Sequence, residues 1–219
     1  MTTKVITIPG YHGSAPEHWQ SWLEAEDPKV ERITGINWEA PNIAEWSAVI
    51  GHRISTSNEQ LVLVAHSFGC LATAKAIVEH PEHVAGVILV APASPRRFCL
   101  SGAIADSATA LHDISQLLPQ SALPGFGLMI GSENDPWMDL ATARYWARVW
   151  DLAFYNAGLA GHINVDSGHG AWPLIREFVD AMQEAVHPLP DEEVTHLGRW
   201  NRNRLNQQPQ VATKQLCYG

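Results

Sequence analysis

The chain has 219 residues, of which 46% are hydrophobic, and this composition is typical of a globular domain rather than a disordered segment. A net charge of −9 argues against nucleic acid as a main partner. No apolar run approaches the ~18 residues of a membrane helix, so we expect no membrane association.

Strand-like and helix-like segments alternate along the chain. Most of the strand-like runs are continuously apolar, which is typical of parallel strands with both faces covered. In chain order the runs are 5–8, 32–36, 61–65, 84–90, 126–130 and 152–155.

Helix signals lie between these runs. Ser14 and Asn42 are each followed three residues later by a glutamate, which is the pattern of an N-cap with a capping box. We expect a helix to begin after each of them, and further helices over 68–80, 138–150 and 172–186. The alternation predicts right-handed crossovers and a three-layer α/β domain over residues 1–186.

Two segments depart from the alternation. Segment 93–125 is long, with a helical piece around 104–118, and is either a cap over the site or a crossover helix with long ends. Segment 187–219 is a polar C-terminal extension with four basic and three acidic residues. Scattered apolar side chains, Trp200 above all, predict that it packs as an arm that supports a homodimer.

The third run leads into Ala65-His66-Ser67-Phe68-Gly69, directly before a helix-like segment. Small residues on both sides of a serine permit the tight strand-to-helix turn of a nucleophile elbow, which exposes the serine hydroxyl above the sheet. Ala65 stands where glycine is more usual, so an ordinary buried serine is the alternative. We interpret His66 as a structural residue whose side chain points away from the neighbouring serine.

A serine nucleophile needs a base and a carboxylate that orients the base. In α/β hydrolases the acid and then the base follow the serine along the chain. Asp135 follows the fifth run and is the expected acid, with Glu133 as its rival and a helix-capping role as the alternative. His162 follows the sixth run and is the expected base, with His169 as its rival.

The remaining site residues surround this trio. The backbone N–H of Phe68, directly after the serine, and that of Tyr11, in the glycine-containing loop after the first run, are the expected oxyanion donors. His12 is expected to line the loop or contact the substrate. Trp137 and Trp172 are candidates for an apolar acyl pocket.

At these motifs the chain resembles the small serine hydrolase family that includes retinoblastoma-binding protein 9, within the α/β-hydrolase superfamily. The matching segments are 9–14 with Glu17 and Trp19, 65–69, 131–132 with 135–136, and 161–164. The resemblance implies a reduced six-stranded parallel sheet with helices on both faces. It also implies a Ser67–Asp135–His162 triad that hydrolyses small carboxylic esters or amides. Retinoblastoma-protein binding is not carried over, because the Leu-x-Cys-x-Glu docking signal is absent.

We therefore predict a serine hydrolase that cleaves a small ester, thioester or amide through an acyl-enzyme, without a cofactor or metal. The same residues would suit lactone opening or perhydrolysis. The alternative is a catalytically weak member that acts as a protein- or ligand-binding module. Three sparse cysteines and an N-terminus without a signal-peptide pattern predict a cytoplasmic location.

Overall fold

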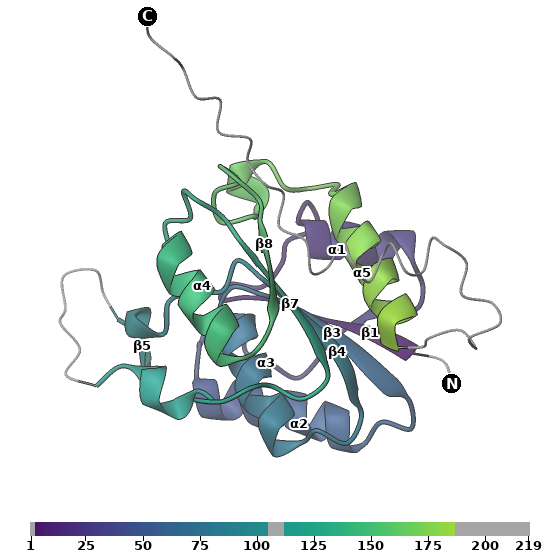
Figure 1. Cartoon of the computed structure of the whole chain (residues 1–219), viewed down its shortest axis with the longest axis horizontal. Helices are drawn as coiled ribbons and strands as arrows, with labels where there is room; N and C mark the ends of the chain where they lie inside the picture. Colours follow the sequence, from purple (N-terminus) through teal and green to yellow (C-terminus); the bar gives the residue numbers. More distant parts are fainter. Residues whose placement is uncertain (1–2, 105–111, 187–219) are drawn as a thin grey trace, which may run out of the picture.

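The computed structural model of the chain describes residues 3–104 and 112–186 (Figure 1). Within these residues six strands form one parallel sheet in the order β2-β1-β3-β4-β7-β8. The strands are β1 (Thr3–Ile8), β2 (Val30–Arg32), β3 (Gln60–His66), β4 (Val84–Val90), β7 (Phe126–Gly131) and β8 (Ala153–Asn156). The predicted parallel sheet is confirmed.

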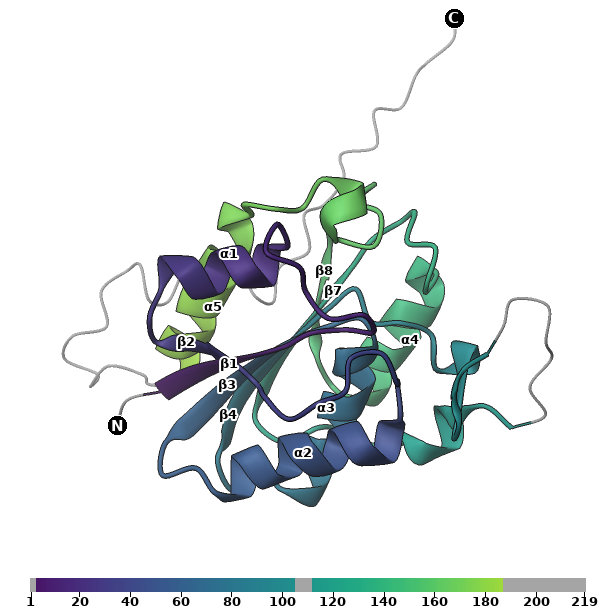
Figure 2. The ribbon, with the colours of Figure 1, turned by 180° about the vertical axis from the view of Figure 1, so that it is seen from behind.

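Helices cover both faces of the sheet (Figures 1 and 2). On one face lie α1 (Trp19–Glu26) and α5 (Pro173–Val186), and on the other lie α2 (Ile43–Ser55), α3 (Phe68–Glu79) and α4 (Leu140–Val149). Successive residues of β3 alternate between the two cores: Leu63 packs on the α2–α3–α4 side, and Val62 and Val64 pack on the α1–α5 side. Both faces are therefore apolar, which explains the unbroken hydrophobic runs.

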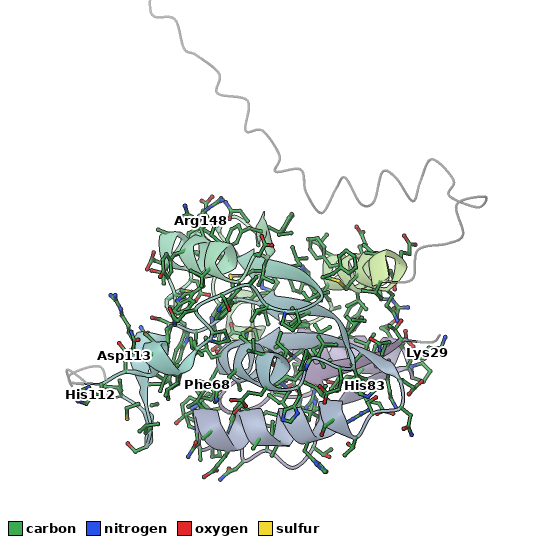
Figure 3. All side chains as sticks on the ribbon, turned by 60° about the horizontal axis from the view of Figure 1, so that its bottom comes forward. Lys29, Phe68, His83, His112, Asp113 and Arg148 are labelled. Carbon is green, nitrogen blue, oxygen red and sulfur yellow. The ribbon has the colours of Figure 1, made fainter. Side chains whose placement is uncertain are left out.

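Side chains fill the space between sheet and helices (Figure 3). Phe68 is fully buried within this packing, whereas Lys29 and Arg148 lie at the edge of the molecule (Figure 3). Every helix in residues 3–104 and 112–186 is too short or too polar to cross a bilayer.

Helix α1 begins later than predicted. His18, not Ser14, is its N-cap, and the His18 ring accepts a hydrogen bond from the Gln20 backbone N–H at 3.2 Å. Ser14 instead donates its hydroxyl to the Gln20 side chain at 2.6 Å. The predicted N-cap of α2 is confirmed, because the Asn42 side chain accepts from the backbone of Ala44 at 3.0 Å.

The second strand is displaced from its predicted position. It covers Val30–Arg32 instead of 32–36, and its pairing with β1 ends where Arg32 meets Thr7. Gly35 adopts a φ of +86°, a left-handed conformation that does not fit an extended strand. The apolar side chain of Ile33 is still buried, so the hydrophobic pattern extended past the end of the strand.

Segment 93–125 contains a two-stranded hairpin and short turns instead of a crossover helix in its described part. These elements are η1 (Pro95–Arg97), β5 (Phe98–Cys99), β6 (Gly102–Ala103) and η2 (Ile114–Leu117). Phe98 is fully buried against Phe68 at a ring distance of 4.5 Å, so the hairpin is fastened beside the start of α3. Residues 105–111, and the extension 187–219 with its predicted dimer arm, lie outside the described residues.

Candidate active site

Ser67 occupies the turn between the last residue of β3 and the first residue of α3. Its backbone adopts φ 54° and ψ −125°, a conformation that non-glycine residues rarely adopt. Its N–H donates to the Val90 carbonyl at the end of the neighbouring strand, at 3.1 Å. Such strain is kept where the surrounding structure fixes it, and it is the geometry expected of a nucleophile elbow.

Two glycines permit this turn. A Cβ on Gly69 would lie 2.4 Å from the Pro9 carbonyl oxygen, and a Cβ on Gly10 would lie 2.6 Å from the Ser67 Cβ. Real Cβ atoms do not approach other atoms so closely, so both positions require glycine. The loop after β1 therefore runs directly against the Ser67 side chain.

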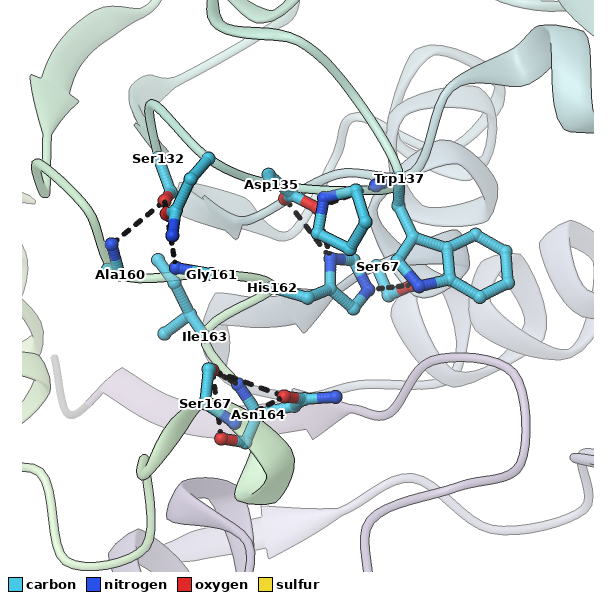
Figure 4. Close-up of polar contacts among 12 residues, drawn as sticks. Ser67, Ser132, Asp135, Trp137, Ala160, Gly161, His162, Ile163, Asn164 and Ser167 are labelled. Carbon is cyan, nitrogen blue, oxygen red and sulfur yellow. Dashed lines mark hydrogen bonds and ion pairs between the residues drawn. The ribbon is translucent and has the colours of Figure 1, made fainter.

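Ser67, His162 and Asp135 form one hydrogen-bonded chain (Figure 4). Ser67 Oγ lies 2.9 Å from His162 Nε2, while His162 Nδ1 lies 2.9 Å from Asp135 Oδ1 and 3.1 Å from Oδ2. The side chains of His162 and Asp135 are 7% and 3% exposed. An ionised carboxylate can only accept, so Nδ1 carries a proton and the Nε2 lone pair faces the serine hydroxyl.

The structure does not bring the rival residues to Ser67. The exposed Glu133 carboxylate accepts from the Asn156 side chain at 2.8 Å. His169 Nδ1 lies 3.3 Å from the Ser167 hydroxyl, and its ring packs edge-on against Trp172.

Two loops carry the predicted acid and the predicted base. We call them the acid loop, residues 132–137 after β7, and the base loop, residues 157–164 after β8. Ser132 and Asn134 join them, and Figure 4 shows the contact between Ser132 and Ala160. The buried Ser132 hydroxyl accepts from Ala160 N–H at 3.0 Å, and Asn134 Oδ1 accepts from Gly161 N–H at 2.7 Å. This role of Ser132 was not predicted from the sequence, in which its position directly after a strand is the one signal that points to it.

His66 lies against the base loop. Its Nε2 lies 2.9 Å from the His162 carbonyl oxygen. The His66 and His162 ring centroids are 4.9 Å apart.

Residues 5–181 match the family model described as Serine hydrolase. The chain belongs to the serine hydrolase family.

Two relatives of this serine hydrolase cover most of its length. It is 27% identical over 186 residues to YdeN of Bacillus subtilis (strain 168), which is named as a hydrolase, and the match covers 82% of this chain and 95% of that protein. A solved structure described as a YdeN-like hydrolase from Pectobacterium atrosepticum is 32% identical, with a TM-score of 0.75 over 85% of this chain and 94% of that one. The finer link to retinoblastoma-binding protein 9 stays a prediction.

A more distant structure extends the likeness in fold alone. Est1E from Butyrivibrio proteoclasticus, solved with ferulic acid bound, has a TM-score of 0.58 at 13% identity, over 94% of this chain and 90% of that one. The protein is a hydrolase with the three-layer α/β-hydrolase fold.

The predicted oxyanion donors follow two residues that meet each other: Phe68 follows Ser67, and Tyr11 follows Gly10, whose backbone lies against the Ser67 side chain. Phe68 is the first residue of α3, so its N–H has no acceptor within the helix. The neighbouring N–H groups of His12 and Gly13 donate to Trp38 and Gly10 carbonyls at 2.9 Å each. Among the described residues, the Tyr11 N–H has no such acceptor.

The three candidate pocket residues occupy different places. Trp137 is half-buried and stacks on His162 with a centroid distance of 5.6 Å. His12 is exposed, and its Nδ1 lies 2.8 Å from a Glu39 carboxylate oxygen. Trp172 packs edge-on against Trp19 at 5.6 Å, on the α1–α5 side of the sheet.

Buried histidines surround the proposed base. Burial, helped by the charges of Arg32 and His162, lowers the pKa of His18 from 6.5 to about 4. Burial, helped by the charge of His162, also holds the pKa of His66 well below its usual range. Both rings are therefore neutral at pH 7 and add no positive charge beside the base. The described residues contain no group of three or more His, Cys, Asp or Glu side chains arranged to hold a metal ion.

Proposed function

We propose that this serine hydrolase cleaves a small carboxylic ester, thioester or amide through an acyl-enzyme on Ser67. The observation that carries the proposal is the buried chain from Ser67 Oγ through His162 to Asp135, with links of 2.9 Å each. This is the arrangement that turns a weakly nucleophilic hydroxyl into an attacking group.

Acylation begins with the serine hydroxyl. Ser67 Oγ attacks the substrate carbonyl carbon while His162 Nε2 takes the hydroxyl proton. Asp135 keeps the proton on Nδ1 and stabilises the imidazolium that forms. His162 then passes its new proton to the leaving alcohol, thiol or amine, and the acyl group remains on Ser67. In the second half of the cycle a water molecule attacks the acyl carbon while His162 Nε2 takes its proton. The bond between the acyl carbon and Ser67 Oγ then breaks, His162 returns the proton to Ser67 Oγ, and the carboxylic acid leaves.

The negative charge that develops on the carbonyl oxygen needs preorganised donors. The N–H groups of Phe68 and Tyr11 suit this role, because one begins α3 beside Ser67 and the other lies in the loop pressed against Ser67. Removing one such donor by mutation lowers kcat by roughly 10²–10³-fold in a serine hydrolase.

The aromatic residues next to His162 indicate which kind of acyl group the substrate carries. Trp137 stacks on His162, and Phe98 stacks in turn on Trp137 at 6.4 Å. Aromatic faces beside the reacting groups favour an apolar acyl chain or ring over a charged one. We expect the exposed His12 to contact the substrate, whereas Trp172 packs in the core on the other side of the sheet from Trp137.

The proposal is tested with p-nitrophenyl esters of increasing acyl length. Ser67→Ala and His162→Asn should each lower kcat by roughly 10⁴-fold or more while the far-UV circular dichroism spectrum stays unchanged. The matched controls Glu133→Gln and His169→Asn should keep at least half of the activity. If Ser67→Ala retains a tenth of the wild-type rate, the assignment is wrong. If the wild type hydrolyses no ester, thioester or amide, the binding-module alternative gains support.

A further inference from the structure

The base loop is held in a backbone conformation that it would not adopt by itself. Gly161 and Ile163, on either side of His162, have φ values of 59° and 47°. Left-handed backbone is uncommon for any residue with a Cβ, and for a β-branched residue such as isoleucine it is an outlier. Ile163 is also fully buried. Such a conformation persists only where neighbouring groups fix it.

Two side chains from outside the loop supply hydrogen bonds at this point. His66 Nε2 lies 2.9 Å from the His162 carbonyl oxygen, and Trp19 Nε1 lies 2.8 Å from the Ile163 carbonyl oxygen. A carbonyl oxygen accepts only, so both side chains are the donors. His66 is 4% exposed and Trp19 is fully buried, so water does not compete freely for either carbonyl.

The two donors connect the base to the rest of the site. His66 precedes Ser67 directly and ends β3, and Trp19 begins α1. The rings of His66 and Trp19 pack against each other at right angles, with centroids 5.9 Å apart. The strand that presents the serine therefore also holds the backbone of the histidine that faces this serine.

We propose that His66 and Trp19 are positioning residues. They hold the His162 and Ile163 carbonyls so that His162 Nε2 stays within hydrogen-bond reach of Ser67 Oγ. The inference rests on the proposed function, because it takes His162 as the base. It assigns neither side chain a contact with the substrate. Losing either donor lets the base loop relax, and a displacement of about 1 Å at a reacting group can cost roughly 10²-fold in rate.

A matched pair of variants isolates the hydrogen bond. His66→Gln keeps an N–H donor at about the reach of Nε2, and His66→Met has similar length without a donor. Trp19→Phe removes the other donor and keeps most of the aromatic packing. Melting temperature, kcat and KM are measured for each variant, with Ser67→Ala as the inactive baseline. Proton NMR records the downfield resonance of the His162 Nδ1–H that is hydrogen-bonded to Asp135.

If His66 and Trp19 position the base loop, the three variants should differ in kcat and in the downfield resonance. His66→Met should lower kcat by about 10- to 100-fold with KM changed by less than about threefold, and should broaden or lose the downfield resonance. His66→Gln should recover most of kcat, and Trp19→Phe should lower kcat about 3- to 10-fold.

Two results would overturn the inference while Ser67→Ala remains inactive. One is that folded His66→Met keeps kcat within about twofold of wild type. The other is that His66→Met and His66→Gln lose activity equally, because the loss would then come from ring shape and not from the donated bond. If His66→Met does not fold, Trp19→Phe decides alone, and an unchanged kcat with an unchanged resonance overturns the inference. Activity retained by Ser67→Ala would instead overturn the proposed function.

Discussion

Acid should destabilise the fold through His18, and the size of the effect follows from its burial. His18 is 4% exposed, and burial lowers its pKa from 6.5 to about 4 in the folded protein. Between pH 6.5 and pH 4, His18 therefore binds a proton in the unfolded chain but not in the folded chain. The free energy of unfolding consequently falls as pH falls, and the loss is complete below pH 4.

The linkage relation gives the magnitude. A shift from 6.5 to about 4 corresponds to a loss of roughly 3 kcal/mol by pH 4, of which roughly 2 kcal/mol is lost between pH 7 and pH 5. His66, whose pKa is also lowered by burial, contributes with the same sign. Other titrating groups also change the free energy of unfolding with pH. A variant that differs only at residue 18 is therefore required to isolate the contribution of His18.

His18→Asn is that variant. Asparagine can still accept from the Gln20 N–H as the N-cap of α1, but it does not titrate. Urea unfolding followed by circular dichroism at pH 7 and pH 5 gives four free energies. From pH 7 to pH 5 the wild type should lose about 2 kcal/mol more than His18→Asn. Equal losses, within about 0.5 kcal/mol, would refute the reasoning that buried neutral His18 limits acid stability.

Three further predictions test separate features. Gly10→Ala places a methyl group 2.6 Å from the Ser67 Cβ, so kcat/KM for a p-nitrophenyl ester should fall by roughly 10²-fold; a fall below threefold would contradict the close approach. Ser132→Ala removes the acceptor of the Ala160 N–H, so urea unfolding should show a loss of about 1–3 kcal/mol. Deleting residues 188–219 should convert a dimer to a monomer in analytical ultracentrifugation, and an unchanged mass would exclude the predicted arm.

The parts of the fold that the sequence predicts well are those governed by local pattern. Strand β4 has the predicted limits, 84–90, because its apolar run coincides with its hydrogen-bonded extent. Strand β2 was misplaced because Ile33 is buried after the strand has ended, and burial alone does not mark a ladder. The start of α1 was misplaced because Ser14 satisfies its hydroxyl on Gln20 instead of capping the helix.

The same division holds for the site. Ser67, Asp135 and His162 could be chosen from chain order and strand ends, and the structure brings these three together. The roles of His66 and Trp19 could not, because they depend on two carbonyl groups that face them only after folding. A histidine beside the nucleophile and a tryptophan at a helix start look in sequence like ordinary core residues.

Active-site labelling decides whether Ser67 is the nucleophile that forms a covalent acyl-enzyme. The full-length protein is treated with a fluorophosphonate probe, and intact mass and peptide mapping locate the adduct. We predict one adduct per chain, on Ser67, with labelling abolished in Ser67→Ala and strongly slowed in His162→Asn. If the wild type forms no adduct, or if an adduct persists in Ser67→Ala, Ser67 is not the nucleophile.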